Sequence, residues 1–209
     1  MLEFRAVIWD FDGVILDALP VRTEAFLYAL REYSQEALEE FKCYHLQNGG
    51  ISRFVKISHF FEKIIKQPCP ETLKQKILSD FHRVVHERLF DSSLLIIDSI
   101  SYIQEHFSHL EFYIASGSEQ EELRSLCDFL QISRYFKGIY GSPTPKVQWV
   151  EKIVQNSVYD TKEFVLIGDS MGDYESARRN HISFLGYNNP NLKSVGQYIL
   201  SFNPLCFAD

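Results

Sequence analysis

The sequence predicts an α/β fold, in which a Rossmann-like parallel sheet carries helices on both faces and an all-helical subdomain is inserted after the first strand. Short apolar segments recur along the chain, and most of them end in polar or glycine-rich residues. Helical patterns separate these segments, and this alternation is typical of a parallel sheet covered by helices. One long stretch near the N-terminus contains helical patterns alone, which indicates the inserted subdomain.

The first apolar segment is Phe4–Trp9, which runs directly into Asp10. Short apolar runs of this kind are typical of strands that are buried on both faces. Further strand candidates are Phe112–Ala115, Gly138–Tyr140, Phe164–Gly168, Ile182–Leu185 and Tyr198–Phe202. The helical patterns between them are Ile96–Phe107, Glu119–Leu130, Lys146–Gln155 and Tyr174–Asn180.

The stretch from Leu19 to His86 breaks this alternation because it contains no convincing strand. Its helical patterns are Pro20–Tyr33, Ser34–His45, Ser52–Ile65 and Glu71–Arg88, with turn-forming residues between them. We therefore expect residues 1–16 and 89–209 to form the core domain and residues 17–88 to form a helical cap subdomain.

Composition excludes several classes of function. The 209 residues suit one domain with an insert, and 45% hydrophobic residues supply a core. The net charge of −7 argues against a nucleic-acid partner. No apolar run is long enough for a transmembrane helix, and no signal peptide is evident. The four cysteines are widely spaced, which favours reduced thiols over a zinc site. We expect a soluble, cytoplasmic protein without a membrane partner.

Acidic residues follow two of the predicted strands. Asp10 and Asp12 follow the first strand, and Asp169 follows the strand at 164–168. Ligands of open parallel sheets bind beyond the carboxyl ends of the strands. Clustered carboxylates repel one another unless a cation lies between them, and hard oxygen ligands favour Mg²⁺. The alternative interpretation is that Asp10 and Asp12 only form a turn before Gly13.

Two further charged residues belong to the same predicted edge. The segment 142–146 predicts a helix start with Thr144 as its N-cap. Lys146 then lies in the first turn, where the helix dipole disfavours a cation; a nearby carboxylate or phosphate would explain it, and a solvated lysine is the alternative. Asp173 lies three residues after Ser170, which fits a capping box, and it could also support a metal.

Together these residues resemble the haloacid dehalogenase superfamily, in its phosphoglycolate phosphatase and β-phosphoglucomutase-like branch. Four motifs occur in the superfamily's order: D-F-D-G-V-I from Asp10, A-S-G-S around Ser116, Lys146, and G-D-S-M-G-D around Asp169. The helical insert lies where this superfamily places a C1-type cap, so the resemblance spans the whole chain.

The resemblance implies a two-step phosphoryl transfer. Asp10 is then the nucleophile that forms an aspartyl-phosphate, and Asp12 is the general acid and base. The residues implied to bind the phosphoryl group are Ser116, Gly117 and Lys146, together with the amide of Phe11. The implied Mg²⁺ ligands are Asp10, Asp12 through its backbone carbonyl, Asp169 and Asp173.

Two arginines of the insert are candidates for substrate binding. The loop G-G-I-S-R resembles the cap loop of β-phosphoglucomutases, with Ser52 as a helix N-cap and Arg53 as the first helical residue. Arg53 can hold a carboxylate or phosphate bidentately; an exposed arginine at a helix start is the alternative. Arg22, shortly after the first motif, is the second candidate. Lys42 and Lys56 carry no local pattern that marks either of them as reactive.

These observations favour a Mg²⁺-dependent phosphatase that hydrolyses a small phosphorylated metabolite of the phosphoglycolate or sugar phosphate class. A β-phosphoglucomutase-like mutase is the alternative, although Gly168 stands where such mutases typically carry an acid. A non-catalytic phosphometabolite-binding module is disfavoured because Asp10, Asp12 and Lys146 are all present. The sequence predicts neither the particular substrate nor the oligomeric state.

Overall fold

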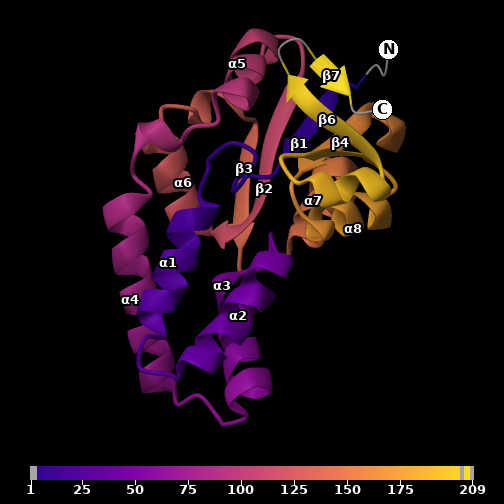
Figure 1. Cartoon of the computed structure of the whole chain (residues 1–209). Helices are drawn as coiled ribbons and strands as arrows, with labels where there is room; N and C mark the ends of the chain where they lie inside the picture. Colours follow the sequence, from indigo (N-terminus) through magenta and orange to yellow (C-terminus); the bar gives the residue numbers. More distant parts are fainter. Residues whose placement is uncertain (1–3, 203–204, 208–209) are drawn as a thin grey trace.

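The computed structural model describes residues 4–202 and 205–207 (Figure 1). The described strands form one seven-stranded sheet in the order β3-β2-β1-β4-β5-β6-β7. All neighbours pair in parallel except β7, which is antiparallel to β6. The strands are β1 (Ala6–Trp9), β2 (Glu111–Glu119), β3 (Gly138–Ser142), β4 (Phe164–Gly168), β5 (Ser183–Tyr187), β6 (Gln197–Phe202) and β7 (Leu205–Phe207). The predicted parallel α/β fold is confirmed.

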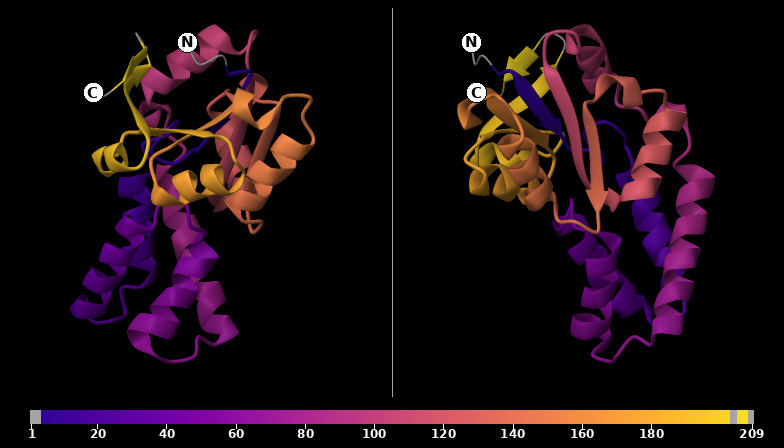
Figure 2. Two further views of the ribbon diagram at one scale, coloured as in Figure 1. Left: turned by 90° about the vertical axis from the view of Figure 1, so that its right-hand side faces the viewer. Right: turned by 180° about the vertical axis from the view of Figure 1, so that it is seen from behind.

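Strand β1 lies inside the sheet, and both of its faces are buried. Val7 and Trp9 pack into one apolar layer, while Ala6 and Ile8 pack into the other. This double burial explains why the segment is continuously apolar. The layer around Trp9 is completed by α5 (Ile97–His106) and α6 (Gln120–Phe129), and the opposite layer by α7 (Lys146–Gln155) and α8 (Met171–Arg179) (Figures 1 and 2). Short 3₁₀ helices lie in the connections: η2 (Ser92–Leu94), η3 (Ser133–Tyr135), η4 (Thr161–Glu163) and η5 (Pro190–Ser194).

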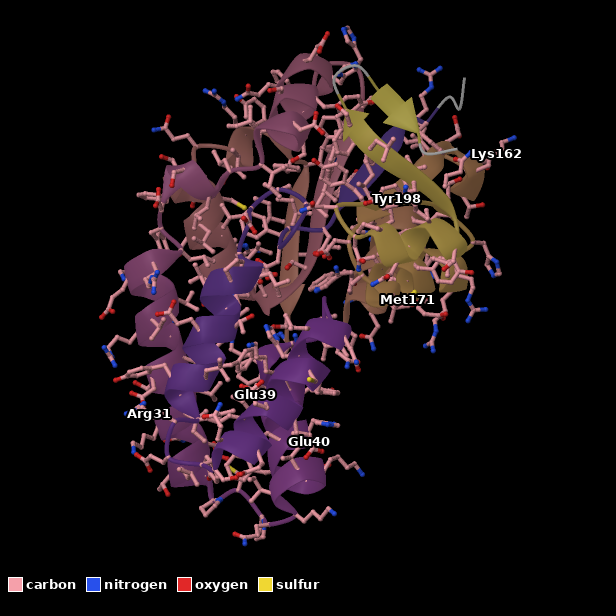
Figure 3. All side chains as sticks on the ribbon, in the orientation of Figure 1. Arg31, Glu39, Glu40, Lys162, Met171 and Tyr198 are labelled. Atoms are coloured by element: carbon pink, nitrogen blue, oxygen red, sulfur yellow. The ribbon has the colours of Figure 1, made fainter. Side chains whose placement is uncertain are left out.

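From residue 19 to residue 88 the regular elements are all helical. They are α1 (Leu19–Ala29), α2 (Gln35–Gln47), α3 (Arg53–His59), the π-helical η1 (Phe60–Ile65) and α4 (Glu71–Arg88), and we call them the helical insert. The insert lies beyond the end of the sheet toward which β2 points (Figure 1). Its outer surface carries exposed charged residues such as Arg31, Glu39 and Glu40 (Figure 3). No helix among the described residues is long and apolar enough to cross a membrane.

The two connections between the insert and the sheet are paired with each other. The amide of Asp17 donates to the carbonyl of Leu94 at 2.8 Å, and the amide of Ile96 donates to the carbonyl of Ile15 at 2.9 Å. The insert is therefore attached through two hydrogen-bonded segments rather than two separate linkers.

Strand β7 is not among the predicted strands, and α1 ends at Ala29 rather than at Tyr33. Two further differences have a clear structural reason. Strand β2 continues past Ala115 to Glu119, because its polar residues still pair with β3 after a shift in register. The helix expected to run through residues 52–65 changes from α3 to η1 at Phe60. The wider π-helical turn brings two consecutive aromatic rings against Tyr33, with Phe60 and Phe61 centroids at 4.9 and 5.7 Å.

Candidate active site

Three strands bring polar side chains to one edge of the sheet. Asp10 follows β1, Ser116 lies in β2 and Asp169 follows β4, and β1 pairs with both of the other strands. The residue before Asp10 is in register with Ile114 on one side and Ile167 on the other. Because the three strands are parallel, the residues that follow these positions lie side by side at their carboxyl ends.

A cluster of three carboxylates, two of them buried and one half-buried, lies at this edge. Ligand atoms of Asp10, Asp169 and Asp173 all lie within 4.8 Å of one another. Lys146 Nζ lies 2.8 Å from Asp10 Oδ1 and also donates to Asp173 Oδ1. Burial, together with Asp173, raises the pKa of Asp10 well above its ordinary value. Burial and Asp173 likewise raise the pKa of Asp169 to about 7.

The donor set of this cluster fits a hard divalent cation. Three carboxylates share one ammonium group, so the cluster lacks positive charge. Burial, and after it the repulsion from Asp173, disfavours the charged forms of Asp10 and Asp169, which a bound cation would stabilise. Carboxylate oxygens are the ligands that Mg²⁺ prefers. The backbone also leaves room for Asp169: Gly13 has φ +80°, and a Cβ there would lie 2.1 Å from Asp169 Oδ2.

The starts of two helices position the charged residues that come after β3 and β4. Lys146 lies at the start of α7, and Asp173 lies at the start of α8. The Ser170 amide donates to Asp173 Oδ2 at 3.0 Å, and the Asp173 amide donates to Ser170 Oγ at 3.3 Å, which together form the expected capping box at the start of α8. The Ser170 hydroxyl also donates to Asp173 Oδ2 at 2.6 Å. Helix α7 begins at Lys146 with Pro145 as its N-cap, so the prediction of Thr144 as the cap is wrong. The extended backbone of Pro145 (ψ 141°) keeps it outside the helix.

Asp12 is held through one of its two carboxylate oxygens. Asp12 Oδ2 lies 2.6 Å from Arg22 Nε and accepts a hydrogen bond from Ser118 Oγ at 3.0 Å. Ser118 Oγ in turn accepts from Arg22 Nη2 at 2.7 Å. Asp12 Oδ1 has no hydrogen-bond partner within the described part of the chain. One oxygen is therefore fixed, and the other is available to a ligand.

Glu122 of α6 joins two arginines of the insert to the sheet. Arg22 Nη1 lies 2.9 Å from Glu122 Oε1, and Arg53 Nη2 lies 2.7 Å from Glu122 Oε2. All three residues are buried, and the Arg53 guanidinium also lies over the ring of Phe81 at 4.8 Å. Burial opposes ionisation of Glu122, but the two arginines outweigh it and lower its pKa below the ordinary value. Both arginines expected to bind substrate are thus paired with a protein carboxylate.

The insert is closed over the sheet edge. A Cβ on Gly117 would lie 2.1 Å from the carbonyl oxygen of Gly50, and a Cβ on Gly49 would lie 2.9 Å from the Cβ of Ser170. Only glycines permit this approach of the two backbones. A cavity of about 50 Å³ remains, and residues of both regions line it, among them Asp10, Asp12, Ser116, Arg53 and Lys56.

The sequence comparison decides the family. Residues 7–187 match the family described as haloacid dehalogenase-like hydrolase. The chain belongs to this family. The expectations of haloacid dehalogenase membership and of an enzyme are thereby confirmed. No curated protein matches the chain by sequence.

Solved structures of the family share the fold at low sequence identity. A β-phosphoglucomutase from Clostridium difficile has a TM-score of 0.77 at 18% identity, covering 97% of this chain and 93% of its own. A predicted phosphoglycolate phosphatase from Haemophilus somnus has a TM-score of 0.74 at 15% identity, covering 94% and 93%. A haloacid dehalogenase-like hydrolase from Streptococcus pneumoniae has a TM-score of 0.70 at 18% identity, covering 95% and 94%. These similarities establish the fold.

The structure brings together all the family-motif residues that the sequence singled out. The sheet edge carries Asp10, Asp12, Ser116, Gly117, Lys146, Asp169 and Asp173. The amide of Phe11, expected to face a phosphoryl group, donates instead to Asp10 Oδ1 at 2.7 Å. The sequence analysis assigned no role to Ser118, Glu122 or His45, and it set Lys56 aside. Two of these residues carry a signal in the sequence: Ser118 ends the A-S-G-S motif, and Lys56 lies three residues after Arg53 on the same helix face.

Proposed function

We propose that the chain is a Mg²⁺-dependent phosphatase that hydrolyses a small phosphorylated metabolite, of the phosphoglycolate or sugar phosphate class, through an aspartyl-phosphate. The observation that carries this proposal is the geometry around Asp10. A buried carboxylate lies 2.8 Å from the buried ammonium of Lys146, and a second carboxylate, Asp12, lies two residues further on. This arrangement suits transfer of a phosphoryl group to a carboxylate with proton transfer at the leaving oxygen.

In the first step an Asp10 oxygen attacks phosphorus, and the bond to the substrate's alkoxide breaks. Asp12 gives that alkoxide a proton. In the second step Asp12 takes a proton from water, whose oxygen attacks the aspartyl-phosphate, so that phosphate leaves and Asp10 is restored. Arg22 and Ser118 hold Asp12 in place for both transfers. We assign Ser116, Gly117 and Lys146 to the phosphoryl oxygens.

Mg²⁺ would be held by Asp10, Asp169, Asp173 and the backbone carbonyl of Asp12. When bound, the ion stabilises the negative charge of the transferring phosphoryl group. We further propose that residues 17–88 act as a cap that excludes water when the insert closes. The contact between Gly50 and Gly117 supports this role, because it brings the backbones of the insert and β2 together at the lining of the cavity.

The position of Gly168 favours hydrolysis over a mutase reaction. A Cβ at residue 168 would lie 2.3 Å from the Cβ of Asp173, so an acidic side chain cannot be accommodated here without displacing Asp173. The residue that typically marks the mutases is therefore excluded by the packing of this chain.

The test is release of phosphate from p-nitrophenyl phosphate with Mg²⁺ and with EDTA, comparing the wild type with Asp10→Asn. We expect turnover that needs Mg²⁺ and falls to background in the variant. Asp17→Asn is the matched control, because Asp17 is an exposed acid outside the site. Folded protein that binds Mg²⁺ but releases no phosphate from this ester or from a panel of phosphorylated metabolites would contradict the proposal.

A further inference from the structure

Lys56 of α3 is a buried cation without a carboxylate partner. Its side chain is 4% exposed, and within residues 4–202 and 205–207 it forms no ion pair. Its Nζ contacts His45 alone, at 2.8 Å from Nδ1 and 3.4 Å from the carbonyl oxygen, apart from the Phe26 ring at 5.9 Å. The other buried cations of the site, Arg22, Arg53 and Lys146, each contact a carboxylate.

The hydrogen-bond chain behind Lys56 fixes its orientation. The hydroxyl of Thr23 donates to the carbonyl of Leu19 at 2.7 Å, so its oxygen accepts from His45 Nε2 at 3.1 Å. His45 Nδ1 is then the acceptor that faces Lys56. Burial, with Lys56 and Arg22, lowers the pKa of His45 to about 3, so His45 is neutral and supplies no compensating charge. Two N–H groups of Lys56 point to His45, and the third has no partner among the described residues.

Lys56 also faces the reacting groups. It lines the same cavity as Asp10, Asp12 and Ser116. Burial lowers its pKa to about 8 despite opposing effects of Asp12 and Asp169. A buried charge that lacks a counterion is costly, so a ligand anion at this position supplies the interaction that the protein lacks.

We propose that Lys56 binds a carboxylate on the leaving group of the substrate, so that the enzyme prefers compact phosphorylated hydroxy acids over phosphorylated sugars or diols. This inference rests on the proposed phosphatase function. Two observations narrow the class. Lys56 lines the same small cavity as Asp10 and Asp12, which favours a short separation between the phosphoryl group and the carboxylate that Lys56 binds. Arg53, the group best suited to hold a second phosphate bidentately, is already paired with Glu122.

Matched ester pairs test the proposal directly. We would compare 2-phosphoglycolate with 2-hydroxyethyl phosphate, and 3-phosphoglycerate with glycerol 3-phosphate. In each pair, a carboxylate of the first ester is replaced by a hydroxymethyl group in the second. We expect the wild type to favour the acids in kcat/KM, and Lys56→Met to reduce that preference by about 10- to 100-fold, the range for a hydrogen bond to a charged group. Lys56→Arg should restore part of it. Lys63→Met is the matched control, because Lys63 is an exposed lysine of η1 in the same insert. This variant should preserve the preference for the acids.

A second readout does not depend on turnover. The hydroxy acid products should inhibit the wild type competitively and inhibit Lys56→Met about 10-fold less strongly. Equal loss on acid and diol esters, or a wild type that favours the diols, would overturn the role of Lys56 while leaving the phosphatase intact. Absence of Mg²⁺-dependent hydrolysis of every ester, p-nitrophenyl phosphate included, would instead overturn the proposed function and this inference with it.

Discussion

The sheet edge and the helical insert have opposite charge arrangements. At the sheet edge, the carboxylates of Asp10 and Asp173 share the single ammonium of Lys146. On the insert side, Arg22 and Arg53 share the carboxylate of Glu122, Arg22 also pairs with Asp12, and Lys56 has no carboxylate partner among the described residues. The sheet edge therefore lacks positive charge and suits a metal ion, whereas the insert lacks negative charge and suits a substrate anion. The sheet edge thus supplies carboxylates for a cation, and the insert supplies a cation for a substrate anion.

The largest effect should come from the residue at which the two regions meet. Asp12→Asn removes the proton donor while leaving the contact with Arg22 possible, and we expect kcat on alkyl phosphates to fall by about 10²- to 10⁴-fold. The first step with p-nitrophenyl phosphate should be slowed less by this substitution, because its leaving group needs no proton. Steady-state kinetics on both esters check this. A similar small loss on both would remove Asp12 from proton transfer.

Closure can be blocked at the glycine contact. In Gly117→Ala the new Cβ would overlap the Gly50 carbonyl oxygen at 2.1 Å, so the insert should be held open and kcat/KM should fall by about 10²-fold through misplaced groups. Small-angle scattering should show a larger radius of gyration. Gly196→Ala is the control, because its Cβ would meet its nearest neighbour at 3.4 Å. Unchanged dimensions in Gly117→Ala would show that the two regions do not depend on this contact.

The carboxylate of Glu122, which joins α6 to the insert, should contribute measurably to the free energy of unfolding. Glu122→Gln removes the buried counterion of Arg53 and one of the two counterions of Arg22, and we expect the free energy of unfolding at pH 7 to fall by about 3 kcal/mol. The folded-state pKa of Glu122 is lowered, so its contribution is present above its unfolded pKa and is lost as pH falls through the folded value. Urea unfolding with Glu121→Gln as control checks this, since Glu121 is exposed. Equal stabilities of the two variants would contradict the assignment.

The affinity of the carboxylate cluster at the sheet edge for Mg²⁺ should depend on pH. The pKa of Asp169 is raised to about 7 without metal, so its proton competes with Mg²⁺ below that pH. We expect the apparent affinity for Mg²⁺ to be about 10-fold weaker at pH 6 than at pH 8, as one proton must be displaced. Titration of Mg²⁺ by calorimetry at both pH values measures it. An affinity independent of pH would place the ion away from Asp169.

The sequence predicts the residues of the sheet edge well, but it does not predict the contacts that the helical insert makes with them. Asp10, Ser116 and Asp169 each follow or end an apolar segment, and parallel strands bring such positions together regardless of the details of packing. Glu122, His45 and Lys56 meet only because the insert packs onto the sheet in one orientation, which depends on many apolar contacts. For that reason the sequence did not predict the buried ion pair of Arg53 with Glu122, which excludes an exposed Arg53 and leaves substrate binding by Arg53 a prediction.

The hydrogen bonds of Asp17 to Leu94 and of Ile96 to Ile15 tie the two ends of the insert to each other. We expect two segments paired in this way to act as a single hinge between the insert and the sheet. Rotation about the axis is easy, whereas sliding or twisting would break backbone hydrogen bonds. Closure of the proposed cap should therefore bring Lys56 back to the same side of the cavity that Asp10 and Asp12 line, so a few backbone hydrogen bonds would limit the variation in how substrate is held.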